Sequence, residues 1–134
     1  MTAEPYGCSA GSVRHSIRAM GDLEHLTREL REFAAQRDWE QFHSPKNLAA
    51  ALSVEAAEVL EHFQWLTEQE SRSLPSDRRV EVSLELADVL LYLLRLADCL
   101  DVDLVEAARR KLAINAERYP AERARGSNRK YTEL

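Results

Sequence analysis

The sequence contains few of the residues that form tight turns between β-strands. Among its 134 residues there are only four glycines and four prolines. Hairpins need these residues at defined turn positions, so a protein built mainly from strands would be poorly supplied with them. Alanine, leucine, glutamate and arginine are frequent instead, and all four are strong helix formers. The composition therefore predicts an all-α protein, and its length fits a single domain.

Cysteine is scarce, and no long apolar run is present. The two cysteines, Cys8 and Cys99, are too few to suggest a disulfide framework, and Cys99 lies among leucines and alanines as a small core residue would. No segment reaches the length of a transmembrane helix, and the N-terminus lacks the apolar segment of a signal peptide. We therefore expect a soluble cytoplasmic protein with no membrane partner.

Positive charge is also in short supply. Lysine and arginine total 18 against 23 aspartates and glutamates, which gives a formal net charge of −5 at pH 7. Binding to a nucleic-acid polymer depends on cationic side chains that neutralise phosphates, so this balance argues against such a partner. An acidic protein can still bind a small phosphate compound when a cation mediates the contact.

Apolar residues recur at helical spacing from Asp22 onwards. We expect four helices: from Asp22 to a polar loop at residues 37–46, from Ser44-Pro45 to about Leu66, at residues 77–100 after a linker at 67–76, and at residues 104–119 before Pro120. The third is apolar around much of its circumference, which predicts a buried, central position. The expected architecture is an antiparallel four-helix bundle formed by residues 21–134, preceded by a disordered arm at residues 1–20.

Two acidic steps interrupt the most apolar helices. Glu55 and Glu58 lie three residues apart in the second helix, and Glu85 and Asp88 repeat this spacing in the third. Residues three apart share one helix face and lie about 4.5 Å apart along the helix axis. If the two helices pack antiparallel, the four carboxylates converge. Such a group would be strongly repulsive without a hard divalent cation such as Mg²⁺, which takes oxygen ligands.

Two other interpretations of the acids compete with metal binding. Each pair could be an ordinary solvated helix face, but the apolar neighbours of these four acids favour metal binding. A di-iron bundle would need two inward Glu-x-x-His pairs. Only one such spacing, Glu40-x-x-His43, was found, and it falls in the polar loop. We therefore favour a site for a hard cation.

Aromatic and basic residues accompany the acidic segments. Aromatic rings stack on nucleobases, although by pattern alone Trp39, Phe42, Trp65 and Tyr92 are more often core residues. Basic side chains gather in the last quarter of the chain, where guanidinium and ammonium groups would suit phosphate oxygens. Lys111 and Asn115 lie one helical turn apart beside an apolar stripe, so a solvated surface explains them less well.

Several motifs resemble those of one family. They are FAAQRDWEQFH at residues 33–43, the two acidic steps, FQW at 63–65, DVLLY at 88–92, Lys111-x-x-x-Asn115-x-x-Arg118-Tyr-Pro120, and RKYTEL at 129–134. Residues 22–134 are thereby similar to the dCTP pyrophosphatases of the MazG-like, all-α NTP pyrophosphatase superfamily. The acidic steps are typical of the superfamily, whereas the Trp39 segment, the Phe-Gln-Trp motif and the tail are typical of the dCTP branch.

This resemblance implies a set of site residues and an assembly. The metal ligands for Mg²⁺, or alternatively Mn²⁺, would be Glu55, Glu58, Glu85 and Asp88. The nucleotide would contact Trp39, His43, Trp65, Tyr92, Lys111, Asn115 and Arg118. Relatives are usually homotetramers, dimers of dimers, and often share pockets between subunits. Some relatives carry a histidine for base contact where this chain has Leu30, so we expect looser discrimination among bases.

The implied activity is hydrolysis of dCTP or a related deoxynucleotide to the monophosphate and pyrophosphate, in nucleotide-pool house-cleaning. A water held by a carboxylate such as Glu58 would attack the α-phosphorus in line, and no serine, cysteine or histidine nucleophile is needed. Two alternatives remain: a non-catalytic helical interaction module, or the same fold acting on another substrate such as dUTP or phosphoribosyl-ATP. Loss of one acid would cripple an enzyme but leave an interaction module nearly unchanged.

Overall fold

Helices make up the whole regular structure of the described part of the chain. The computed structural model describes the backbone of residues 12–134 and side chains from residue 21 onwards. The elements are α1 (Ser12–Ala35), η1 (Glu40–Phe42), α2 (Pro45–Glu61), α3 (Glu68–Ser71), α4 (Ser76–Cys99), α5 (Leu104–Arg118), α6 (Ala121–Ala124) and η2 (Tyr131–Glu133). No strand occurs among them, which confirms the predicted all-α class.

Local capping explains where several helices begin. The Ser44 side chain accepts a hydrogen bond from the backbone N–H of Asn47, with proline at the first position of α2. Asp103 caps α5 by accepting from the N–H of Glu106. A reciprocal capping box between Thr67 and Glu70 begins the short α3. The polar linker therefore contains a helical turn that the apolar pattern does not reveal.

Other helix boundaries differ from the predicted ones. The first helix begins at Ser12, before the expected start at Asp22, and α2 ends at Glu61, before Leu66. A short helix, α6, forms within the polar tail. The disordered arm predicted for residues 1–20 is helical from Ser12 onwards, and residues 1–11 lie outside the described part of the chain.

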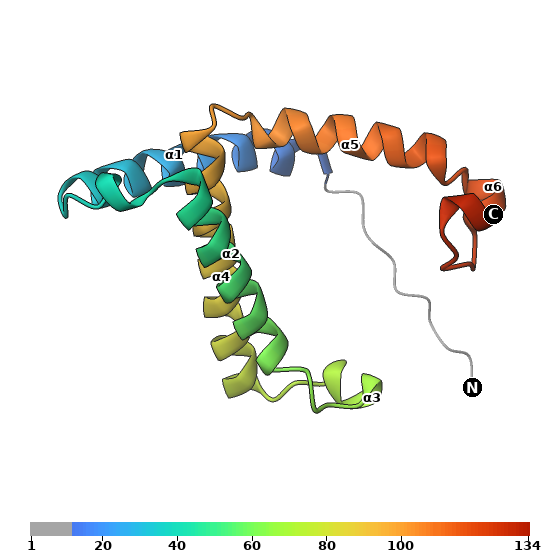
Figure 1. Cartoon of the computed structure of the whole chain (residues 1–134). Coiled ribbons are helices and arrows are strands. Elements are labelled where there is room, and N and C mark those ends of the chain that lie inside the picture. The colour runs from blue at the N-terminus through green and yellow to red at the C-terminus, as the bar shows by residue number, and fades with distance from the viewer. Residues whose placement is uncertain (1–11) are drawn as a thin grey trace.

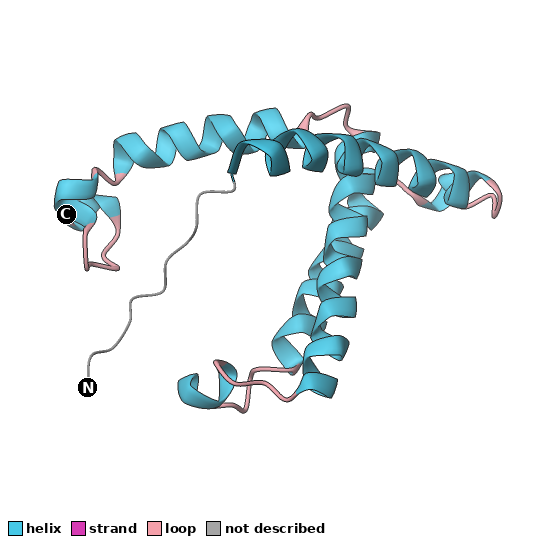
Figure 2. Ribbon diagram, turned by 180° about the vertical axis from the view of Figure 1, so that it is seen from behind, coloured by secondary structure: helices cyan, strands magenta, loops and turns pink. Residues whose placement is uncertain are grey.

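The antiparallel pair of α2 and α4 forms the central unit of the chain (Figure 1). Leu48 of α2 is 2% exposed, and Val82, Leu94 and Ala97 of α4 are also buried. Helix α1 packs across the C-terminal end of α4, where Ala34 is buried. Figure 2 shows that α5 runs away from the α2–α4 pair, carrying the C-terminal segment with it. The molecule therefore has an open shape.

The four long helices do not surround one core within a single chain. The predicted central burial of α4 is not found there: Val80, Leu84 and Leu86 expose 61%, 62% and 53% of their surfaces. On α5, Leu112 is 68% exposed. Apolar periodicity identifies surfaces that favour burial, but it does not say whether the same chain covers them. Of the antiparallel four-helix bundle predicted for residues 21–134, the chain shows the antiparallel α2–α4 pair with α1 packed on it, while these apolar faces of α4 and α5 stay uncovered.

Two smaller expectations also concern burial. Cys99 is exposed rather than a core residue, because it lies at the last turn of α4, where its Sγ is 3.7 Å from the carbonyl oxygen of His43. Cys8 lies outside the described residues. Between residues 12 and 134, no helix is long and apolar enough to cross a membrane.

Candidate metal centre

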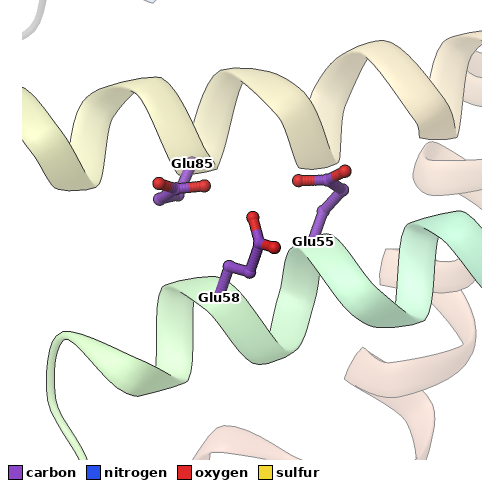
Figure 3. A group of neighbouring side chains, drawn as sticks. All are labelled: Glu55, Glu58 and Glu85. Atoms are coloured by element: carbon purple, nitrogen blue, oxygen red, sulfur yellow. The ribbon is translucent and has the colours of Figure 1, made fainter.

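Three of the four predicted acids meet between α2 and α4. Glu55 and Glu58 project from α2 toward Glu85 of α4 (Figure 3). One carboxylate oxygen from each residue lies within 4.8 Å of the others. This convergence follows from the three-residue spacing on α2 and the antiparallel packing of the two helices. The pair thus presents a compact group of oxygen atoms.

Asp88 lies outside this closest group but belongs to the same electrostatic environment. Its negative charge is one of the causes that raise the pKa of Glu55. Burial is the largest cause, followed by the charges of Glu58 and Asp88. A carboxylate with a raised pKa in the folded protein is one whose charge is disfavoured there. No positive charge of the described residues is among the causes that act on this pKa.

The donor set fits a hard divalent cation. All three converging side chains offer carboxylate oxygen, which suits Mg²⁺ or Mn²⁺ and not the metals that prefer sulfur ligands. Glu58 is exposed, whereas Glu55 and Glu85 are half-buried. The cluster is therefore anchored on one side and open to solvent at Glu58, which leaves access for a phosphate compound. We infer that these residues could hold such a cation.

The polar stripe continues beyond the predicted acids. The Nε2 atom of His62 is 3.9 Å from an oxygen of Glu85, and its Nδ1 atom is 4.0 Å from Glu81. A guanidinium nitrogen of Arg78 lies 3.3 Å from the same Nδ1 atom. Sequence reasoning missed these neighbours, although His62 follows Glu58 by one helical turn and Glu81 precedes Glu85 by one turn. This four-residue spacing places each neighbour on the same helix face as an acid of the cluster, and it could have identified both from the sequence.

The predicted aromatic residues do not gather at one place in the chain. Trp39 precedes α2 and packs edge-on against His43, with ring centroids 6.4 Å apart. Trp65 follows the same helix, whose 17 residues span about 25 Å. Their exposed fractions are 44% and 86%, so the interpretation of both as core residues, made from pattern alone, is wrong. Phe42 is also 60% exposed. One chain therefore does not bring both tryptophans to one base.

The predicted phosphate-binding side chains lie apart as well. Lys111, Asn115 and Arg118 belong to α5, which runs away from the α2–α4 pair (Figure 2). The Arg118 guanidinium lies 5.1 Å from the centroid of the Tyr131 ring. Tyr92 is half-buried on α4, and its position in the chain places it one turn beyond Asp88. Among the predicted site residues, a single chain thus brings together the acidic cluster and the Trp39–His43 pair.

The fold and the acidic cluster define a helical protein with a candidate site for a divalent cation. Comparison with known proteins is more specific: residues 50–134 match the model of the MazG-like family. The chain belongs to the MazG-like family.

Its relatives include proteins named for one activity. The chain is 47% identical over 128 residues to dCTP pyrophosphatase 1 of Homo sapiens, which covers 94% of this chain and 75% of that protein. It is 46% identical over 114 residues to dCTP pyrophosphatase 1 of Mus musculus, covering 84% and 67%. A crystal structure of a pyrophosphatase from Archaeoglobus fulgidus matches with a TM-score of 0.70 at 44% identity, covering 74% of this chain and 93% of the other.

The raised pKa of Glu55 predicts how its replacement changes stability. The charged form is disfavoured in the folded state, so it lowers stability above the folded pKa, and this cost disappears as pH falls and Glu55 takes up a proton. Glu55→Gln should therefore raise Tm at pH 7 in chelator, with a gain that shrinks as the buffer becomes acidic. Thermal unfolding across pH measures this.

A matched control separates this effect from a general change in charge. Glu32→Gln removes one exposed carboxylate from α1, away from the cluster, and should leave Tm nearly unchanged. In saturating Mg²⁺ the Tm of wild type should instead be higher than that of Glu55→Gln, because a cation that binds only the folded wild-type protein stabilises it. A Glu55→Gln protein less stable than wild type in chelator at pH 7 would contradict repulsion within the cluster.

Proposed function

We propose that this protein hydrolyses dCTP or a closely related deoxynucleoside triphosphate to the monophosphate and pyrophosphate, with Mg²⁺, or alternatively Mn²⁺, as cofactor. The observation that carries the proposal is the convergence of Glu55, Glu58 and Glu85 between α2 and α4. It is supported by membership of the MazG-like family and by 47% identity to the human protein named dCTP pyrophosphatase 1. From the sequence pattern alone, we place this activity in the cytoplasm.

The roles of the acids follow from their positions. Glu55, Glu58, Glu85 and Asp88 would hold the cation. When bound, Mg²⁺ supplies charge neutralisation for the polyphosphate. Glu58 is the exposed member of the cluster, so its carboxylate is the one best placed to orient a water molecule. In this proposal Glu58 takes a proton from that water. The oxygen of the water attacks the α-phosphorus in line, and pyrophosphate leaves.

A panel of nucleotides tests this function directly. Pyrophosphate release should be measured for each canonical deoxynucleoside triphosphate and for 5-methylated dCTP. We expect release from dCTP and a discrimination against other pyrimidines below about 100-fold, because an apolar side chain such as Leu30 rejects wrong substrates weakly. A strict preference for dCTP would contradict this role of Leu30. No release from any nucleotide would contradict the proposed enzymatic activity and favour a non-catalytic interaction module.

We further propose that the protein acts as a homotetramer, a dimer of dimers, whose sites are shared between chains. Leu84 and Leu112 are more than half exposed, and Trp65 exposes 86% of its surface. Apolar surface of this extent is uncommon on monomers and typical of association surfaces. Sharing would also bring together side chains that one chain keeps apart, because Trp39 and Trp65 lie at opposite ends of α2 and the basic side chains of α5 lie away from the α2–α4 pair (Figure 2).

A mixing experiment tests the shared site. Glu58→Gln removes the proposed general base, and Trp65→Ala removes a proposed base contact, so each variant alone should be impaired at low dCTP. If Glu58 and Trp65 of one site come from different chains, co-refolding equal amounts should regenerate about a quarter of the sites. Turnover at low dCTP measures the recovery, and native mass spectrometry confirms mixed assemblies.

Two measurements make this test decisive. The helix content of Trp65→Ala, measured by circular dichroism, should remain close to that of wild type, because the side chain is exposed within the chain. Glu32→Gln mixed with Glu58→Gln is the matched control, which should show only the activity of the Glu32→Gln chains. Mixed assemblies without recovery would place Trp65 and Glu58 of each site in one chain, or remove Trp65 from the site.

A further inference from the structure

Arg95 is a buried charged residue that the proposed reaction does not use. Its side chain on α4 is 10% exposed, and it is the buried charged residue of the described core, at 8% exposure for the whole residue. Burial of a guanidinium is costly unless hydrogen bonds and an opposite charge compensate it. The partners of Arg95 therefore indicate its role.

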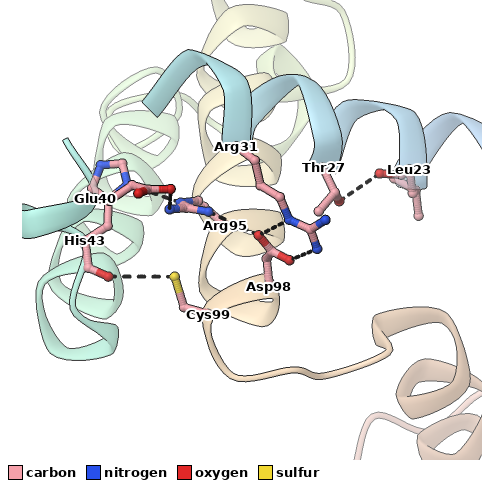
Figure 4. A network of polar contacts seen from close by, with 8 residues as sticks. All are labelled: Leu23, Thr27, Arg31, Glu40, His43, Arg95, Asp98 and Cys99. Atoms are coloured by element: carbon pink, nitrogen blue, oxygen red, sulfur yellow. Dashed lines mark hydrogen bonds and ion pairs between the residues drawn. The ribbon is translucent and has the colours of Figure 1, made fainter. Parts of the chain in front are cut away.

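Arg95 connects α4 to the segment before α2 and, through Asp98, to α1 (Figure 4). Its Nε atom donates to Nδ1 of His43 at 3.2 Å, and its Nη1 atom donates to Asp98 at 3.1 Å. Its Nη2 atom is 4.0 Å from a carboxylate oxygen of Glu40. Asp98 also accepts two hydrogen bonds from Arg31 of α1. Asp98 thus supplies the negative charge that offsets both arginines.

The contact with His43 determines which ring nitrogen carries hydrogen. A guanidinium has only donors, so the Nδ1 atom that faces Arg95 must be the acceptor. In a neutral imidazole the hydrogen then resides on Nε2, and no described residue forms a hydrogen bond with that atom. Protonation would place a second N–H against the arginine. Burial, followed by the charge of Arg95, lowers the pKa of His43, while Glu40 acts in the opposite direction.

We infer that Arg95 is a positioning residue that holds His43 as a neutral imidazole with its hydrogen on Nε2, beside Trp39, so that this N–H donates to a carbonyl oxygen of the substrate's pyrimidine. The inference rests on the proposed function for the presence of a base near Trp39. The opposite tautomer would present an acceptor and would suit an exocyclic amino group instead. A carbonyl is common to all pyrimidines, so this contact selects pyrimidines as a class.

The network also fixes where His43 lies. The backbone carbonyl of His43 accepts a contact from Cys99 Sγ at 3.7 Å, so both ends of the residue are tied to the last turns of α4. Hydrogen bonds from Arg31, and then the charges of both arginines against the effect of burial, lower the pKa of Asp98. Asp98 therefore stays ionised near neutral pH and keeps Arg95 in place.

The tautomer is tested by NMR on the full-length protein with ¹⁵N-labelled histidine, with His43 assigned through His43→Gln. Wild type should show Nε2 protonated and Nδ1 unprotonated at neutral pH. In Arg95→Met this preference should be lost and the pKa of His43 should rise, because both the donor and the positive charge are removed. A wild-type His43 with its hydrogen on Nδ1 overturns the inference.

Kinetics supply the second readout. Arg95→Met should raise KM for dCTP about tenfold with little change in kcat, as expected for the loss of one hydrogen bond that positions the base. Arg79→Met is the matched control on the exposed part of α4 and should change neither value. If Arg95→Met does not fold, Arg95→Lys carries the test. The lysine ammonium cannot contact His43 and Asp98 at the same time as the forked guanidinium does, so KM for dCTP should be higher than in wild type for this variant too.

The outcomes separate this inference from the proposed function. Wild-type protein with no turnover of any nucleotide contradicts the proposed function. An active wild type whose KM for dCTP is unchanged in a folded Arg95 variant overturns the inference alone. A raised KM together with a lost tautomer preference supports it.

Discussion

Repulsion among carboxylates across the α2–α4 interface is the constraint on which the rest of this structure depends. The two helices pack antiparallel, and this packing carries three acids to within 4.8 Å of one another, with the charge of Asp88 nearby. Burial and these charges together raise the pKa of Glu55. Such an arrangement lowers stability unless a cation offsets it. The pair of helices that forms the core is thus also the element that presents the candidate metal centre.

The same pair is also the basis of the proposed tetramer. Because α2 and α4 bury few side chains between them, much apolar surface of α4 and α5 remains exposed in one chain. The aromatic and basic residues expected around a nucleotide are distributed over both ends of α2 and along α5. A second chain could cover the apolar faces and complete the binding site in one step. Stability and substrate binding would then have a common origin.

Part of this structure could be predicted from local sequence. The spacing of Glu55 and Glu58 placed both acids on one face of α2, and Ser44-Pro45 marked the beginning of that helix. The end of α2 at Glu61 was missed, since the following turn contains residues that continue a helical pattern. The burial of α4 was misjudged because periodicity does not identify the covering surface.

Long-range polar contacts were beyond local sequence patterns. Arg95 contacts His43 across 52 positions of the chain, and Arg31 contacts Asp98 across 67. No periodicity links such pairs, whose meeting depends on the packing of α1 and the segment before α2 against α4. His62 was closer to prediction, because it extends the acidic face of α2 by one turn. Side chains that orient a site are thus less visible in sequence than those that form it.

The most direct test of the central claim is pyrophosphate release from dCTP while free Mg²⁺ is titrated upward from excess chelator. The protein should release no pyrophosphate without a divalent cation, and turnover should rise with Mg²⁺ to saturation. The reason is that the converging carboxylates need a cation before a polyphosphate can bind. Undiminished turnover in excess chelator would contradict both the metal centre and the proposed mechanism.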